Sequence, residues 1–152
     1  LRESENKLSN FFDKRIKIAF VLFFLTGATG SITALADVLF PSASFVEGFI
    51  EDFDSTSEVL TRLRILHPFV STILSIFLFS ESNRFKKEFA IDTSTIKVLV
   101  IVGVILGVLN VVSNIILPLS ILHLLLADLL WITYVYKAVE KATLLKIPQN
   151  ID

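Results

Sequence analysis

The sequence of 152 residues contains no cysteine, no methionine, one tryptophan and only two histidines. Without cysteine there is no disulfide, no thiolate metal site and no attachment point for a c-type haem. The formal net charge of -1 gives no global reason to expect nucleic acid as a partner. We also find no P-loop, GxSxG, HExxH or dinucleotide fingerprint. The absence of methionine even at residue 1 indicates a trimmed or edited N-terminus, and no cleavable signal is evident.

Apolar residues dominate what is present. The chain is 53% hydrophobic, contains 14 phenylalanines and has a mean hydropathy of +0.73. A soluble domain of this size cannot hide so much apolar surface. A membrane-spanning helix needs about 20 mostly apolar residues, and four segments meet that requirement: about 16–39, 61–79, 96–117 and 119–139. The sequence therefore predicts an all-α, polytopic four-helix bundle in the membrane, with residues 1–152 forming a single domain.

The linker at residues 41–60 is the longest connection between the predicted spans and is acidic. Its apolar side chains recur at helical spacing, at Phe45, Phe49, Ile50 and Phe53. Such a pattern is typical of an amphipathic turn on a membrane surface.

The basic residues predict the orientation of the chain. All but two of its 14 Lys and Arg residues lie on one side of the predicted bundle, and Lys and Arg mark the cytoplasmic side. We therefore expect both termini in the cytoplasm and loop 41–60 outside a multi-pass cell-membrane protein. The residues on the cytoplasmic side are Arg2, Lys7, Lys14, Arg15, Lys17, Arg84, Lys86, Lys87, Lys97, Lys137, Lys141 and Lys146.

Both histidines lie inside predicted spans, near their outer ends. His67 is about five residues into the second helix and His123 about four into the fourth, or roughly 6–8 Å deep. These two helices run parallel and diagonally in an up-down bundle. Ligating side chains are rare inside a membrane and usually functional. The pair therefore predicts a shared ligand near the outer face, most naturally a haem iron; the alternative is two imidazoles bonded to backbone.

Residues around each histidine fit a flat macrocycle. Ser71 follows His67 at i+4, while Ala127 and Trp131 follow His123 at i+4 and i+8. The small side chains leave room for the ring and Trp131 is placed to pack on its edge. The alternative is that small residues simply allow close helix approach.

Arg62 and Arg64 are the two outer-side cations, and arginine holds carboxylates such as haem propionates through its forked donors. The alternative for Arg64 is an ion pair with Glu58 or the acidic loop. Deep in the fourth helix, Asp128 should be paired, hydrogen-bonded or protonated.

The candidate partners of Asp128 are Asn110 and Asn114 on the third helix, which would form a polar clamp with it. Gly103 and Gly107 lie on the same stripe of that helix, and their spacing is more typical of plain helix packing than of a dimer motif.

The segments RLRILHP around His67 and LHLLLADLLW around His123 resemble the heme A synthase family of cytochrome oxidase assembly proteins, over a match from Phe20 to Val139. Full-length members have two four-helix halves, each with a histidine pair, and this chain resembles the second half, which holds a b-type haem. The resemblance implies oxidation of a haem O methyl group to give haem A, with His67 and His123 as axial ligands. The alternatives are a bis-His b-type cytochrome for electron transfer and an assembly partner with a structural haem.

One position departs from the family. A glutamate usually lies three residues before the first histidine, where this chain has Arg64, and Glu58 is the nearest outer acid and so our predicted catalytic residue. The paired cysteines of many members are also missing. Because one bundle has one histidine pair, we expect a homo-oligomer. The expected partners are haem O, membrane lipid, and a haem O synthase or a quinone-type electron acceptor.

Overall fold

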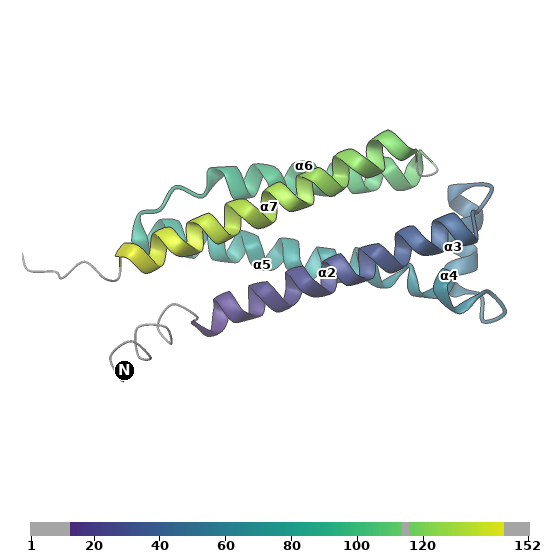
Figure 1. Cartoon of the computed structure of the whole chain (residues 1–152), viewed down its shortest axis with the longest axis horizontal. Helices are drawn as coiled ribbons and strands as arrows, with labels where there is room; N and C mark the ends of the chain where they lie inside the picture. Colours follow the sequence, from purple (N-terminus) through teal and green to yellow (C-terminus); the bar gives the residue numbers. More distant parts are fainter. Residues whose placement is uncertain (1–12, 114–115, 145–152) are drawn as a thin grey trace, which may run out of the picture.

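The computed structural model describes residues 13–113 and 116–144, all of whose regular elements are helical (Figure 1). The predictions that involve Arg2, Lys7, Asn114 and Lys146 lie outside these residues. The elements are α2 (Lys14–Leu39), α3 (Phe45–Phe53), α4 (Val59–Leu63), α5 (Leu66–Phe89), α6 (Ser94–Val112) and α7 (Leu117–Leu144). The predicted all-α class is confirmed.

Four helical stretches are long and apolar enough to cross a membrane: α2, the combined α4 and α5, α6, and α7. The chain is thus a multi-pass membrane protein. The acidic linker contains the helix α3, in agreement with the helical spacing of its phenylalanines.

The second predicted helix ends near residue 79, whereas α5 continues to Phe89. Residues 80–89 are mostly polar but include several good helix formers, and Lys86 and Lys87 suit the negative end of the helix dipole. The helix stops at Ala90, whose φ of 54° gives a left-handed cap. At the other end, Pro68 lies in the first turn, where its missing N–H is not needed.

The four long helices form two close pairs. Along most of their length α2 packs on α5 and α6 packs on α7, and the pairs meet mainly through α5 and α6. We call the end that carries α3 and α4 the loop end, and the end where α2 begins and α7 finishes the terminal end. Figure 1 shows the pairs close together at the terminal end and splayed toward the loop end.

The buried core follows this shape. Its cluster is drawn from the terminal half of the bundle and includes Ala19, Leu78, Phe85, Ile96 and Tyr134. Toward the loop end of α2, α4 and α5, the fully buried residues are few, namely Ala36, Thr61 and Arg64. Many large apolar side chains point outward, as expected of helices that face lipid.

Charged residues join three helices at the terminal end. Asp13 caps α2 by accepting from the Ile16 N–H at 2.9 Å, and it also accepts from Arg84 of α5 at 2.9 Å and from Lys141 of α7. Burial alone would raise the pKa of Asp13, but the hydrogen bonds from Lys141, Ile16 and Arg84 lower it well below its usual value. This network holds the terminal end closed.

Candidate functional site

The two histidines meet between the helix pairs. The ring centroids of His67 and His123 are 6.4 Å apart, the ring planes are perpendicular, and both side chains are half-buried. The sequence placed them at similar depth on different helices, and the fold brings their rings together.

The separation fits two imidazoles that share one metal ion. An imidazole nitrogen binds a first-row metal at about 2.0–2.1 Å and lies about 1.1–1.2 Å from its own ring centroid, so two collinear ligands have centroids about 6.2–6.6 Å apart. The observed 6.4 Å lies within this range. Within the described residues no group of three or more His, Cys, Asp or Glu side chains gathers around an ion site, so the pair suits an ion whose other ligands belong to a macrocycle.

A backbone carbonyl of α2 orients the first ring. His67 Nδ1 lies 3.2 Å from the carbonyl oxygen of Thr26 and 3.5 Å from the hydroxyl of Thr29. A carbonyl only accepts, so Nδ1 carries the proton and Nε2 keeps its lone pair. Metal-ligating histidines commonly make this second hydrogen bond.

The second ring is less constrained by the protein. His123 Nδ1 is buried and has no hydrogen bond of normal geometry among the described residues, with the backbone of Gly103 near the ring as an acceptor. A buried polar atom without a partner requires an explanation. Binding a metal through Nε2 would leave Nδ1 unchanged, so the fit to the haem that the sequence predicts rests on the ring separation.

Each histidine rests on a glycine of the neighbouring helix. A Cβ added at Gly30 of α2 would lie 3.1 Å from Cε1 of His67, and one added at Gly107 of α6 would lie 3.2 Å from Cε1 of His123. A Cβ at Gly103 would meet Leu126 of α7 at 3.2 Å. The Gly103–Gly107 stripe therefore packs α6 on α7 within one chain, as the packing alternative predicted.

An aromatic cluster closes the site toward the terminal end. Trp131 packs edge-on against Phe20 and Phe23 of α2, with ring centroids 4.9 Å away in both cases. Trp131 was predicted to pack on the macrocycle edge, and its neighbours here are these two rings. Ser71 is half-buried and donates to the Pro68 carbonyl at 3.2 Å, while Ala127 is exposed.

At the loop end, Arg64 is buried among three carboxylates. Its Nη1 lies 3.0 Å from Asp37, its Nε 2.8 Å from Asp52 and its Nη2 3.3 Å from Glu51. The guanidinium thus ties the acidic helix α3 to the end of α2, and the pairing with the acidic loop that we considered is present. Burial raises the pKa of Asp52, although Arg64 acts in the opposite direction.

The other two predicted loop-end residues lie differently. Arg62 has a buried Nε with no hydrogen-bond partner in the described part of the chain. Glu58 is exposed, immediately before α4, and its side chain does not cap that helix. Among the described residues, Glu58 forms no hydrogen bond or ion pair with either histidine.

Asp128 does not form the predicted clamp with Asn110. The Asn110 amide oxygen accepts from the Ser120 hydroxyl at 3.1 Å instead, because Ser120 starts the neighbouring helix at the same level. Asp128 is exposed on α7 and is not paired with any residue that the structure describes. The other candidate, Asn114, lies outside those residues.

Sequence reasoning missed the α2 side of the site. Thr26, Thr29 and Gly30 lie on one face of that helix, and Asp37 follows two turns later. The sequence pattern that could have revealed them is the run TGATGSITALAD, which combines small, hydroxyl and acidic residues inside an apolar span. Such residues in a membrane helix usually face the bundle interior.

Comparisons with known proteins identify a family and two relatives. A family model described as cytochrome oxidase assembly protein matches residues 3–135. Two relatives from two strains of Thermus thermophilus, both named protoheme IX farnesyltransferase, are 29% identical over 125 residues, which is 77% of this chain and 20% of theirs. The chain therefore spans about a fifth of the length of these curated relatives. No solved structure matches the chain.

Proposed function

Because the chain belongs to the cytochrome oxidase assembly protein family, the heme A synthase family, we propose that it oxidises a methyl group of haem O on the way to haem A. The single observation that carries the proposal is the His67–His123 pair, with its 6.4 Å centroid separation. When bound, the haem supplies an iron that changes oxidation state.

The chain's own residues hold and orient the haem. His67 and His123 would hold the haem iron, and the Thr26 carbonyl keeps the His67 tautomer that leaves Nε2 free. Arg62 has an unpartnered donor and is the cation available for a propionate. Arg64 already holds three carboxylates, so its contribution is to position the loop end.

Two acids are candidates for proton transfer during the oxidation. Glu58 is the acid predicted from the sequence. Asp37 is the second, because its side chain is only 12% exposed and is bonded to Arg64, the residue at the family's glutamate position. Glu58→Gln and Asp37→Asn remove the proton acceptor with little change in shape, so each tests one acid.

The proposal is tested in cells that make haem O. Cells with the protein should accumulate haem A or its alcohol intermediate, which is measured by extracting and separating the haems. His67→Ala and His123→Ala should abolish both the product and the low-spin spectrum. If Glu58 or Asp37 transfers the proton, Glu58→Gln or Asp37→Asn, respectively, should lower the yield of haem A while the haem stays bound. Absence of haem A and of the intermediate, with normal low-spin haem, would refute the enzymatic role.

A second function remains a candidate because the chain has only two histidines. The family reaction implies a substrate haem and a cofactor haem, and one pair ligates one of them. A bis-His b-type cytochrome needs no second site. This function predicts that quinol reduces the bound haem rapidly while no haem A forms; the enzyme predicts a homo-oligomer in mild detergent.

We also propose a protohaem farnesyltransferase as the source of the substrate. The curated relatives are named for that activity. A farnesylated protohaem belongs to the class of haem O, so its synthesis would precede the reaction proposed here.

A further inference from the structure

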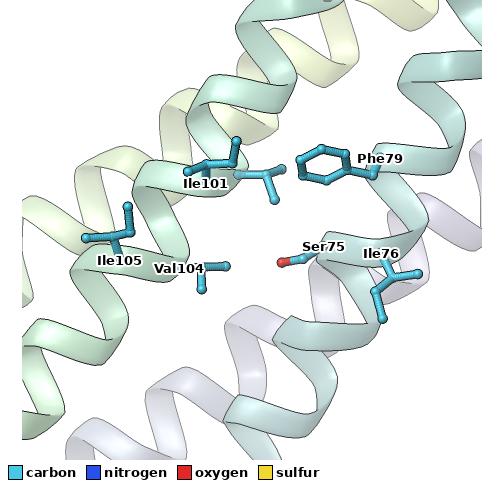
Figure 2. A pocket seen from close by; sticks show the side chains of 7 residues that line it. Ser75, Ile76, Phe79, Ile101, Val104 and Ile105 are labelled. Atoms are coloured by element: carbon cyan, nitrogen blue, oxygen red, sulfur yellow. The ribbon is translucent and has the colours of Figure 1, made fainter.

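An apolar groove runs along the bundle between α5 and α6 (Figure 2). Its volume is ≈ 410 Å³, within the about 300–1,000 Å³ of small-molecule sites. Ser75, Ile76 and Phe79 from α5 and Val100, Ile101, Val104 and Ile105 from α6 line it.

The one polar group in this lining is already satisfied. The Ser75 hydroxyl donates to the Ser71 carbonyl at 2.8 Å, so it demands nothing from a ligand. The groove therefore presents hydrocarbon to whatever lies in it, and it suits a flexible apolar chain rather than a polar headgroup.

Along the helix axes, the groove lies between the level of the histidine pair and the terminal end. Val104 is three residues from Gly107, on which His123 rests, and Ser75 is eight residues beyond His67. At about 1.5 Å per residue these positions lie about 4–5 Å and about 12 Å toward the terminal end.

Arg62 would set the direction of a haem in the site. Arg62, with its unpartnered donor, lies on α4 at the loop end, where propionates also reach water. In a farnesylated haem, the prenyl tail leaves the edge of the ring opposite the propionates. A ring whose propionates point to the loop end therefore directs its tail toward the terminal end, along α5 and α6.

We propose that this groove binds the farnesyl tail of the haem substrate. The inference rests on the proposed function, since only a prenylated haem has such a tail. The residues that line the groove, rather than the two histidines, would then distinguish prenylated from unprenylated haem.

Filling the groove should discriminate between two haems. Val104 is 51% exposed, so Val104→Phe adds bulk to the groove without crowding the buried core. Val102→Phe is the matched control, because Val102 is an exposed residue of the same helix outside the lining. The full-length protein and both variants are loaded with equimolar haem O and haem B, and the bound haems are extracted and quantified.

We expect Val104→Phe to lower the haem O to haem B ratio about tenfold, the usual effect of one overpacked contact. The low-spin spectrum with haem B should stay normal, and Val102→Phe should match the wild type. An unchanged ratio in Val104→Phe would overturn the groove assignment and leave the groove to lipid acyl chains. Failure of the wild type to bind either haem would instead refute the proposed function.

Discussion

Replacing Gly30 with alanine tests whether the close packing of α2 under His67 matters for ligation. The new Cβ would lie 3.1 Å from Cε1 and 3.2 Å from Nδ1 of the ring, whereas ordinary contact begins at 3.4 Å. The ring must therefore move by about 0.3 Å, more than the roughly 0.2 Å that a metal–ligand distance tolerates. The bond from Nδ1 to the Thr26 carbonyl, at 3.2 Å, changes with it.

The matched control is Gly27→Ala in the same helix, where a Cβ meets nothing within 4 Å. Alanine in a helix gains about 0.5–1 kcal/mol over glycine, so Gly27→Ala should raise the unfolding temperature in detergent and keep its low-spin haem. Gly30→Ala should lose low-spin haem. The overpacked contact should destabilise the protein by about 1–3 kcal/mol, which cancels the stabilisation that alanine gives to the helix. Equal stability and equal low-spin haem in both variants would refute the reasoning.

Three further predictions concern the two ends of the bundle. Asp13→Asn keeps a good N-cap but removes the carboxylate that accepts from Arg84 and Lys141, so it should lower the free energy of unfolding at pH 7 by about 1–3 kcal/mol and flatten the acid denaturation. Because the pKa of Asp13 is lowered in the folded protein, its stabilisation is present above the unfolded pKa and is lost as pH falls, so an unchanged acid profile would contradict the network. Arg64→Ala should lower the free energy of unfolding by about 3–5 kcal/mol, because it leaves three carboxylates unpaired. It should also speed proteolysis of loop 41–60. Proteolysis as slow as in the wild type would contradict the role of Arg64 in holding the loop end together. Cysteine at Ser55 should react with an impermeant label in intact cells and cysteine at Lys87 should not, and the reverse labelling would invert the predicted orientation.

Local sequence properties predicted the four candidate membrane spans well. The four apolar stretches correspond to α2, the combined α4 and α5, α6, and α7. Hydropathy and length are properties of a segment alone, which is why they suffice. The polar extension of α5 was missed because the apolar criterion stops at residue 79, whereas helix formation continues through residues that favour it.

Interactions between helices were less predictable. The sequence left open whether Arg64 holds a propionate or the acidic loop, and the structure pairs it with Asp37, Glu51 and Asp52 from two other segments. Asn110 was expected near Asp128 from their depth, but depth does not determine the facing direction of two helices. Successive residues of an α-helix point 100° apart, so a shift of one residue can turn a side chain from a buried partner to an exposed one.

The sequence by itself determined the class of the protein, the number of its candidate spans and the positions of His67 and His123 along their helices, because each follows from the order of residues along one helix. Only the tertiary structure decided that these rings lie 6.4 Å apart, that Gly30 and Gly107 lie beneath them, and that an apolar groove opens between α5 and α6. These features depend on how the helix pairs splay, which many side-chain contacts set together and no single segment encodes.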